Sequence, residues 1–524
     1  MGESNPPESV FNSLPERIRA FAAMRPNHPA LIQDERILTY GELDQAMDRI
    51  ASSLQRAGCK PQDVIAICAL NSIPYVEVFC GALRAGVVTA PLAPSATAES
   101  LVSMIADCGA KLVFVDEAMG AHLAPLRQQI AAGWISLDAS GIGTPIATWM
   151  AVQGTAPAPV IIDPRWPFNI IYSSGTTGVP KGIVQPHAMR TPLAPPTEPF
   201  GYGEHAVAVI STGLYSNTTL VSLFPALGSG STVVLMAKFD ARIFLQLAER
   251  YRATHAMLVP VQYSRIMALA DFDTFDLSAF QMKFCTSAPF SAALKADVLK
   301  RWPGGLTEYY GMTEGGGATV LFAHETPHKL HTVGRPWPWS DIRLIDDNGN
   351  EVAPGEVGEI VGASVSMMKG YHNQPQKTHE AMWHDKAGRP FIRNGNLGRF
   401  DEDGFLILMD RKKDMIISGG FNVYPSDLEA KLREHAAVAD AAVVGFPSEK
   451  WGETPVAFVV LQPGEQVSAE ELRQAVNDRL GKVQRISTIV FLDALPRSHI
   501  GKVLKRELRD SYQRARAVIE SRGA

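Results

Sequence analysis

Short apolar segments alternate with longer amphipathic segments between about residues 60 and 310. The apolar segments are rich in β-branched residues and end in turn-forming or polar residues, as buried strands do. They are KLVFVD (111–116), HAVAVIS (205–211), TVVLM (232–236), HAMLVP (255–260) and QMKFCTS (281–287). Between them, stretches such as ARIFLQLAERYRA and SAALKADVLKRW have helical spacing. This alternation predicts an α/β fold in which helices cover mostly parallel sheets.

The pattern changes after about residue 340. The segments 341–352 and 401–410 contain Asn-Gly and Asp-Gly pairs, which predict hairpin turns. A charged stretch, DRKKD (410–414), is followed by a smaller unit of α+β type. We therefore expect an N-terminal domain of residues 1–410 and a C-terminal domain of residues 411–524.

Two helix starts in the smaller unit have the sequence of a capping box. Ser426 precedes Glu429 by three residues, and Ser468 precedes Glu471 in the same way. In such a box the serine and the glutamate each accept a hydrogen bond from a free backbone N–H of the first turn. We therefore expect helices to begin immediately after Ser426 and after Ser468.

The composition excludes several classes of protein. A chain of 524 residues with 46% hydrophobic content is too long for one ordinary domain. A net charge of -5 disfavours a nucleic-acid binder, and no apolar run is long enough to cross a membrane. The polar start MGESNPPES is not a signal peptide. Five scattered cysteines predict reduced thiols in a cytoplasmic protein: Cys59, Cys68, Cys80, Cys108 and Cys285.

The segment IIYSSGTTGVPKGIV (170–184) carries the strongest chemical signal. After an apolar strand that ends at Tyr172, small residues let backbone N–H groups converge on phosphate oxygens, and Lys181 adds a positive charge. The small residues are Ser173, Ser174, Gly175, Thr176, Thr177 and Gly178. A Walker A loop is disfavoured because Pro180 precedes Lys181 and Gly182 follows it.

This loop resembles the phosphate-binding signature of the adenylate-forming superfamily, which contains acyl- and aryl-CoA ligases, luciferases and the adenylation domains of peptide synthetases. The resemblance extends from LTYGELD (38–44) to GKVLKREL (501–508), and the chain is most similar to 4-coumarate and fatty-acid CoA ligases. It implies a large N-terminal domain of helix-covered sheets with a distorted barrel, and a small mobile α+β C-terminal domain.

By this resemblance, TEYYGMTEGG (307–316) forms the nucleotide and metal site. Tyr310 and Gly311 would lie against adenine, Thr313 would contact the α-phosphate, and Glu314 would hold the Mg²⁺ that accompanies ATP. Glu308 and Tyr309 are assigned to the same nucleotide site. A carboxylate-bound cation would offset phosphate charge and orient the α-phosphorus.

The segment 395–414 resembles the next family motif, in which Arg411 matches an arginine that contacts ribose and phosphate. The chain departs from the family at Asn396, where an aspartate normally accepts hydrogen bonds from both ribose hydroxyls. An asparagine oxygen accepts such bonds without a charge. The substitution predicts weaker ribose binding and leaves the reaction class unchanged.

The C-terminal segment PRSHIGKVLKREL (496–508) resembles the motif that carries the family's catalytic lysine, here Lys502. Lys413 matches the hinge position. The resemblance places Ser418, Gly419 and Gly420 near the channel for the pantetheine arm of coenzyme A. One domain orientation would bring Lys502 to ATP, and a second would move it away.

The implied reaction has two steps. A carboxylate attacks the α-phosphorus of ATP and releases pyrophosphate, and the thiolate of coenzyme A then attacks the acyl-AMP. Lys181, Thr313 and Lys502 would supply the positioning and charge stabilisation that phosphoryl-type transfer needs.

The acyl pocket is expected from three loops. Its candidate residues are Tyr215, Ser216, Ser287, Ala288, Pro289 and Gly315. The stretch 211–220 contains no acidic residue that could pair with an ammonium group, so an amino-acid substrate is disfavoured. Tyr309 stands where several aryl ligases have glycine. These features favour a medium hydrophobic or aromatic acid.

Three alternatives stay open. The chain could be a stand-alone adenylating enzyme that loads a separate carrier protein. It could be a luciferase-like oxygenase that acts on the adenylate. It could also be a nucleotide-binding module with reduced catalysis, an idea suggested by Asn396 and opposed by the presence of Lys502 and Glu314.

Overall fold

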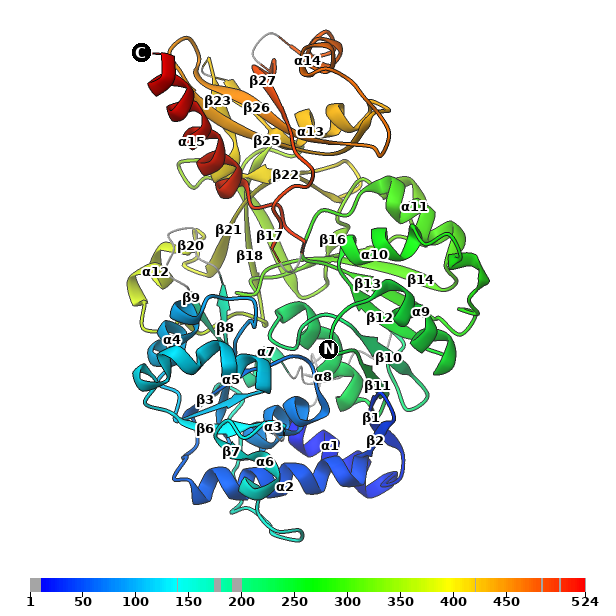
Figure 1. Ribbon diagram of the computed structural model, residues 1–524, viewed down its shortest axis with the longest axis vertical. Coiled ribbons are helices and arrows are strands. Elements are labelled where there is room, and N and C mark those ends of the chain that lie inside the picture. The colour runs from blue at the N-terminus through cyan, green and yellow to red at the C-terminus, as the bar shows by residue number, and fades with distance from the viewer. Residues whose placement is uncertain are drawn as a thin grey trace, which may run out of the picture. The chain divides into compact units, whose positions relative to one another are not determined.

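A computed structural model describes residues 11–138, 140–173, 181–190, 200–419, 421–481, 484–498 and 501–523, the last without side chains beyond residue 515 (Figure 1). The chain forms two compact units. The large unit contains Met1–Ile342 and Gly362–Ile392, and the small unit contains Arg343–Val361 and Arg393–Ala524. A compact unit need not end at a hinge, so the boundary at 410–414 stays a prediction.

The first sheet of the large unit has eight strands in the order β19-β9-β8-β4-β3-β5-β6-β7. Their bounds are β3 Val64–Cys68, β4 Val88–Pro91, β5 Leu112–Val115, β6 Gly133–Ser136, β7 Thr144–Pro145, β8 Pro167–Ser173, β9 Lys181–Pro186 and β19 Gly370–Tyr371. The strands from β8 to β7 are parallel, whereas β9 pairs antiparallel with both β8 and β19. This change of direction places a hairpin at one end of the parallel array.

The second sheet of the large unit has nine strands in the order β16-β15-β14-β13-β12-β10-β11-β1-β2. Their bounds are β1 Pro29–Gln33, β2 Arg36–Thr39, β10 Val207–Ile210, β11 Thr232–Leu235, β12 His255–Leu258, β13 Met282–Cys285, β14 Gly305–Tyr310, β15 Thr319–Phe322 and β16 Arg335–Pro336. The neighbouring strands β14, β13, β12, β10, β11 and β1 are parallel. The pairs at the two edges, β1 with β2 and β14 with β15 and β16, are antiparallel. All five predicted strands are confirmed, as β5, β10, β11, β12 and β13.

Helices pack around these two sheets (Figure 1). They are α1 Leu14–Met24, α2 Tyr40–Arg56, α3 Ile73–Arg84, α4 Ala98–Asp107, α5 Glu117–Leu123, α6 Ile146–Trp149, α7 His187–Arg190, α8 Asn217–Gly228, α9 Ala241–Arg250, α10 Pro260–Met267, α11 Ala292–Arg301 and α12 Pro375–Glu380. Helix α3 is buried almost throughout, because one core cluster joins it to strands of both sheets. A helix buried on all sides can be mostly apolar all round, as this one is apart from the charged residues Glu77 and Arg84.

The remaining sheets belong wholly or partly to the small unit. A five-stranded sheet has the order β17-β18-β21-β20, with β22 paired to β21, and the unit boundaries fall within β17, β18 and β21. Its strands are β17 Ser340–Ile345, β18 Gly358–Ser364, β20 Met382–His384, β21 Pro390–Phe400 and β22 Leu406–Arg411. The predicted Asp-Gly turn joins β21 to β22.

The C-terminal sheet has the order β24-β23-β26-β25, with β27 paired to β26. Its elements are β23 Ile416–Ser418, β24 Phe421–Val423, β25 Val438–Ser448, β26 Gly452–Leu461 and β27 Thr488–Phe491, with helices α13 Pro425–Arg433, α14 Ala469–Asn477 and α15 Lys505–Gly523. The α+β class predicted for this part of the chain is confirmed. No helix of the described residues is long and apolar enough to span a membrane.

One of the two predicted capping boxes is present. Ser468 caps α14 with Glu471, as predicted. The prediction at Ser426 is wrong, because α13 starts one residue earlier at Pro425 and Ser426 lies inside its first turn. The Ser426 N–H instead donates to Asp410 Oδ2 at 2.7 Å. Proline at the first helical position already fixes a helical φ, so it sets the start of α13.

A buried ion pair links α11 to β14. Lys295 and Glu308 contact each other while only 1% and 4% of their side chains are exposed. Lys295 Nζ also donates to the carbonyl oxygens of Leu330 and Thr332, at 2.8 and 3.0 Å. Burial raises the pKa of Glu308 to about 7, despite the adjacent ammonium. The pair holds the strand that leads into Tyr310 against the helix behind it.

We expect Lys295→Met to destabilise the protein by about 3–5 kcal/mol, because it leaves a buried carboxylate without a partner. Glu308→Leu should cost less, because the ammonium keeps two carbonyl acceptors. The double variant should be less destabilised than the sum of the single variants. Urea unfolding of the full chain measures all three. If the double variant loses as much free energy of unfolding as the two single variants together, the two residues are not coupled.

Candidate active site

The predicted phosphate loop connects β8 to β9. Ser173, at the end of β8, is the cross-strand partner of Lys181, at the start of β9. The pairing therefore closes the base of the loop and sets the direction in which Lys181 leaves the sheet. Residues 174–180 lie outside the described part of the chain, and so do the predicted contacts of Ser174, Gly175, Thr176, Thr177 and Gly178.

Lys181 and Glu314 both contact Tyr371. The sequence motifs that assign these two residues to phosphate and to metal are more than a hundred residues apart. The Tyr371 hydroxyl donates to Glu314 Oε1 at 2.9 Å. Lys181 Nζ lies 4.9 Å from the centroid of the Tyr371 ring. Burial raises the pKa of Tyr371, and the Glu314 charge raises it further, so the hydroxyl keeps its proton. We call Lys181, Glu314 and Tyr371 the Tyr371 cluster.

The backbone around Glu314 is held by the segment that precedes Tyr371. The Met368 N–H donates to the Glu314 carbonyl oxygen at 2.8 Å, and Gly315 forms a β-bridge with Met367. Gly315 has a φ of +79°, and a Cβ there would lie 2.0 Å from the Ser366 carbonyl oxygen. Only glycine fits so close an approach of two backbones. Gly315 thus belongs to the turn that orients Glu314, and its predicted acyl contact stays a prediction.

A buried polar network lies behind Thr313. Gln185 Nε2 donates to the Thr313 carbonyl oxygen at 2.6 Å. Arg190 Nη2 donates to Gln185 Oε1 and also to Asn217 Oδ1. Burial lowers the pKa of Arg190 to about 9. The network ties the backbone of Thr313 to β9, α7 and the first residue of α8.

His187 is a structural residue in this arrangement. It is 1% exposed, and its ring packs edge-on against Phe168 at a centroid distance of 5.0 Å. Burial lowers its pKa to about 4, so the ring is neutral at neutral pH.

Two of the three predicted acyl-pocket loops come together at the start of α8. Ser216 is the N-cap of this helix and accepts a hydrogen bond from the Thr218 N–H at 3.3 Å. The Thr218 hydroxyl also bonds the Ser287 hydroxyl, which joins the helix to the loop after β13. Ser287 has a φ of +83°, which a non-glycine residue adopts only under local constraint. Ala288 and Pro289 follow in the same loop and are more open to solvent.

Aromatic rings bound this region. Tyr309 packs against Phe284 and Phe200, with ring centroids 5.8 and 5.6 Å apart. Burial raises the pKa of Tyr215 to about 12, so its hydroxyl is neutral. Tyr310 and Gly311 end β14 and remain partly exposed, whereas the Glu308 carboxylate is occupied by Lys295. Nucleotide contact at Glu308 stays a prediction.

The small unit brings together Asn396 and Arg411, which are cross-strand partners on β21 and β22. The Asn396 N–H donates to Asn394 Oδ1 at 2.9 Å. The two residues that the motifs assign to the ribose therefore lie side by side on adjacent strands. Their adjacency could not be read from the sequence, because a register shift separates Asn396 from Gly398 in this strand pair.

The residues around the predicted hinge are charged and paired. Lys412 Nζ contacts Asp347 at 2.7 Å and Glu359 at 3.1 Å, and Arg393 contacts Glu359 at 2.8 Å. Burial by itself would raise the pKa of Glu359, but hydrogen bonds from Arg393 and Lys412 outweigh it and lower the pKa. Lys413 occupies the middle of the single 3₁₀ turn Lys412–Asp414.

Lys502 lies in a tight hairpin before α15. The Lys502 N–H donates to Ser498 Oγ at 3.2 Å, and Arg497 bridges to Val503 across the turn. Three residues later, Lys505 Nζ contacts Glu429 at 2.8 Å and Asp410 at 3.9 Å. The segment that carries Lys502 is thus anchored to the strand end that enters the predicted hinge.

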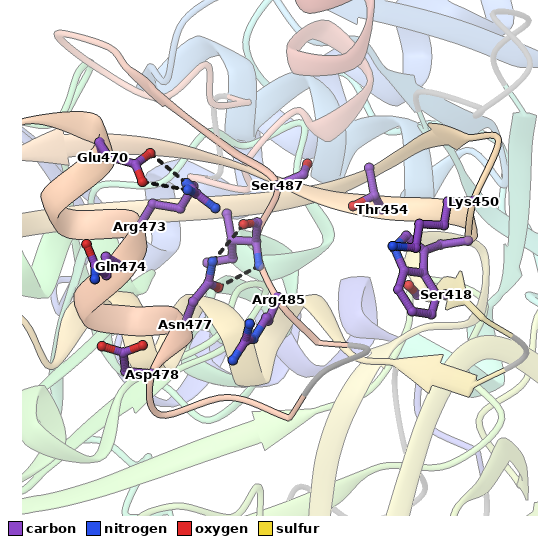
Figure 2. Close-up of a pocket in the computed structure, with 12 residues that line it drawn as sticks. Ser418, Lys450, Thr454, Glu470, Arg473, Gln474, Asn477, Asp478, Arg485 and Ser487 are labelled. Carbon is purple, nitrogen blue, oxygen red and sulfur yellow. Dashed lines mark hydrogen bonds and ion pairs between the residues drawn. The ribbon is translucent and has the colours of Figure 1, made fainter.

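A pocket of about 560 Å³ opens beside Ser418 in the small unit (Figure 2). Its lining combines the basic side chains of Lys450, Arg473 and Arg485 with the indole of Trp451. Arg473 is neutralised by Glu470 at 2.6 Å, whereas Arg485 is exposed. The Gly419 N–H donates to the Trp451 carbonyl oxygen at 2.7 Å, and Gly420 lies outside the described residues.

Sequence reasoning missed Tyr371 and the residues that line the pocket other than Ser418. Tyr371 is 57 positions from Glu314 and 190 from Lys181, and an isolated tyrosine has no distinctive pattern. The pocket is assembled from β23, β26, α14 and the turn before β27, so no contiguous motif contains it. Its basic and aromatic residues would each be interpreted as ordinary surface residues.

The described residues fit a magnesium ion bound together with a nucleotide. They contain no group of three or more His, Cys, Asp or Glu side chains that could hold a metal by themselves. Mg²⁺ is commonly bound by one or two carboxylates together with substrate phosphates and water. Glu314 could supply the protein carboxylate, since Tyr371 uses only Oε1.

Comparison with known proteins identifies the family. A model described as "AMP-binding enzyme" matches residues 18–372, and one described as "AMP-binding enzyme C-terminal domain" matches residues 427–502. The chain is 32% identical over 503 residues to a fatty acid–[acyl-carrier-protein] ligase, ScoC, from Streptomyces coeruleorubidus, covering 94% of this chain and 95% of that protein. It is 31% identical over 524 residues to an indoleacetate–CoA ligase from Aromatoleum aromaticum, covering 96% and 98%.

A solved structure shows the same fold. ATP-bound MatB from Rhodopseudomonas palustris matches with a TM-score of 0.86 at 26% identity, covering 94% of this chain and 99% of that one. Together with the paired motifs, these matches establish that the chain belongs to the AMP-binding, adenylate-forming enzyme family and is an acid–thiol ligase of the AMP-forming kind.

Proposed function

We propose that the protein is an ATP-dependent carboxylate–CoA ligase that forms acyl-CoA, AMP and diphosphate through an acyl-AMP intermediate. Its substrate would be a medium hydrophobic or aromatic acid. The observation that carries this proposal is the Tyr371 cluster, in which the lysine of the phosphate loop and the carboxylate of the nucleotide motif lie against one side chain. An ammonium and a carboxylate presented together suit a phosphate chain with its cation.

In the adenylation half-reaction, Lys181 would neutralise phosphate oxygens while Thr313 contacts the α-phosphate. Glu314 would hold the magnesium ion, whose chemistry is to offset phosphate charge. The substrate carboxylate is itself the nucleophile, so the protein needs to supply position and charge rather than a base. The neutral, buried His187 is consistent with a reaction that needs no general base from the protein.

Lys502 would deliver a second positive charge from the small unit. We propose that the turn Lys412–Asp414, with Lys413 at its centre, is the hinge about which the C-terminal domain predicted at residues 411–524 rotates. A short turn at the end of a strand can absorb a large change in φ and ψ. The contact of Lys505 with Asp410 supports this assignment, because it couples the Lys502 hairpin to the residue that enters the turn.

Lys502→Ala should slow acyl-AMP formation by about 100- to 1,000-fold, the usual effect of removing one preorganised charge-stabilising donor. Thioester formation from supplied acyl-AMP should be largely unaffected, because Lys502 would have moved away. Pyrophosphate exchange measures the first half-reaction, and thiol consumption measures the second. An equal loss in both half-reactions would contradict the rotating-unit assignment.

Coenzyme A is the acceptor that the pocket beside Ser418 favours. Coenzyme A carries a phosphorylated adenosine diphosphate behind its pantetheine arm. The exposed Arg485 and Lys450 and the indole of Trp451 suit phosphates and a nucleobase. A carrier protein presents only the phosphopantetheine arm. The carrier protein is the second candidate acceptor, and the similarity to the fatty acid–[acyl-carrier-protein] ligase supports it.

Arg485→Ala should raise the KM for coenzyme A by about tenfold, which corresponds to one charge-assisted contact. It should not change pyrophosphate exchange or the KM for pantetheine. Lys431→Ala, at an exposed cation on α13 outside the pocket, is the control. An unchanged KM for coenzyme A, combined with efficient acylation of a carrier protein, would favour the carrier-protein alternative.

The aromatic packing around Tyr309 favours a compact acid. Its ring lies against Phe284 and Phe200 next to the predicted acyl loops, so it occupies space that a longer acyl chain would need. The similarity to an indoleacetate–CoA ligase supports an aromatic ring as the acyl group. The absence of an acidic residue in 211–220 again argues against an amino-acid substrate.

Tyr309→Ala should shift preference toward longer acids. The quantity to compare is kcat/KM for an acid two methylenes longer, divided by kcat/KM for the acid that the wild-type protein uses best. We expect this ratio to rise at least tenfold, because a methylene in an apolar pocket changes binding by about 1–3 kcal/mol. Tyr309→Phe, which keeps the volume, should leave this ratio unchanged. The same ratio in all three proteins would show that Tyr309 does not limit the pocket.

A further inference from the structure

Tyr371 stands between two opposite charges. Its hydroxyl donates to Glu314 Oε1 at 2.9 Å, and its ring receives Lys181 Nζ at 4.9 Å from the centroid. Among the described residues, neither Lys181 nor Glu314 takes part in an ion pair, although each is close to the same tyrosine. An ammonium and a carboxylate that contact the same side chain would attract each other if nothing lay between them.

The backbone holds Tyr371 rigidly in this position. Tyr371 is the cross-strand partner of Ile183 on β9, two residues after Lys181. The Tyr371 N–H donates to Thr378 Oγ1 at 2.9 Å, and the next N–H, of His372, donates to the Gly182 carbonyl oxygen at 2.7 Å. The tyrosine is thus attached to the same strand that carries Lys181, so strand pairing fixes the backbone position from which its ring extends.

The consequence for the two charges follows from geometry. The phenol satisfies one carboxylate oxygen and leaves Oε2 for another partner. The ring face attracts the ammonium without consuming one of its three N–H donors in a salt bridge. A direct pair between Lys181 and Glu314 would tie up both groups, and it would have to be broken before a nucleotide or a cation could bind.

We propose that Tyr371 is a positioning residue that keeps the Glu314 carboxylate and the Lys181 ammonium apart and preset for a magnesium–nucleotide complex. The inference rests on the proposed function, because it takes Glu314 as the metal-binding carboxylate. Hydrogen-bond partners of metal ligands commonly change metal affinity by 10- to 100-fold when they are removed.

The test separates the hydroxyl from the ring. Tyr371→Phe keeps the ring under Lys181 and removes only the hydrogen bond to Glu314. We expect the Mn²⁺ dissociation constant, measured by electron paramagnetic resonance with a non-hydrolysable ATP analogue, to rise about tenfold. The Mg²⁺ concentration that half-saturates pyrophosphate exchange should rise equally. ATP affinity in the presence of EDTA should change less than twofold.

Tyr371→Leu also removes the ring, so Lys181 and Glu314 can pair directly. It should show the metal defect and additionally weaken metal-free ATP binding by about fivefold, because the ammonium is then engaged. The unfolding midpoint of each variant shows whether the fold is intact. Tyr40→Phe is the control: its hydroxyl lies 3.0 and 2.8 Å from the carbonyl oxygens of Leu227 and Ser231, so it loses a tyrosine hydrogen bond outside the Tyr371 cluster.

Glu314→Gln distinguishes failure of this inference from failure of the proposed function. If the wild-type protein exchanges pyrophosphate and Glu314→Gln weakens metal binding, unchanged metal affinity in Tyr371→Phe would overturn the positioning role alone. If Glu314→Gln leaves metal affinity unchanged, the assignment of Glu314 is wrong, and the inference falls with it. If the wild-type protein exchanges no pyrophosphate with any carboxylate offered, the proposed function itself fails.

Discussion

The antiparallel pairing of β9 with β8 on one side and β19 on the other is the constraint on which the site of the large unit depends. The first pairing closes the base of the phosphate loop and orients Lys181. The second delivers Tyr371 to the same place from a segment almost two hundred residues downstream. Parallel strands alone could not do this, because each of them needs a long crossover before the chain returns.

Glu314 depends on the same arrangement through backbone contacts. The turn at Gly315 fits against Ser366 and Met367 only because glycine has no Cβ, and these residues lead directly into β19. The segment that supplies Tyr371 to Glu314 therefore also holds the backbone of Glu314. The residues predicted to hold metal and phosphate are positioned by hydrogen bonds between main chains, which are stiffer than contacts between exposed side chains.

In the small unit, ion pairs surround the predicted hinge. Glu359 receives Arg393 and Lys412, while Lys505 connects Glu429 and Asp410. Both groups of charges flank the turn that contains Lys413. Partly buried ion pairs with several members restrict geometry more than isolated surface pairs do. They can define where a rotation occurs without adding much to stability.

The sequence alone determined the class of fold and the enzyme family, and it predicted the residues of the site. Short apolar runs, helical spacing and capping residues are local patterns, so the strands β5, β10, β11, β12 and β13 followed from them, as did the cap of α14. The motifs around Lys181, Glu314, Arg411 and Lys502 are each contiguous in the chain, so the amino-acid sequence is enough to indicate the family. The start of α13 was missed because Pro425 and Asp410 outweighed the capping pattern at Ser426.

Only the tertiary structure decided which of these groups meet. Tyr371, the ion pair of Lys295 with Glu308, the register that sets Asn396 beside Arg411, and the pocket at Ser418 each join different helices, strands or loops. No local pattern encodes such contacts. They arise from strand order and from burial, which leaves a polar side chain stable only where another segment brings it a partner.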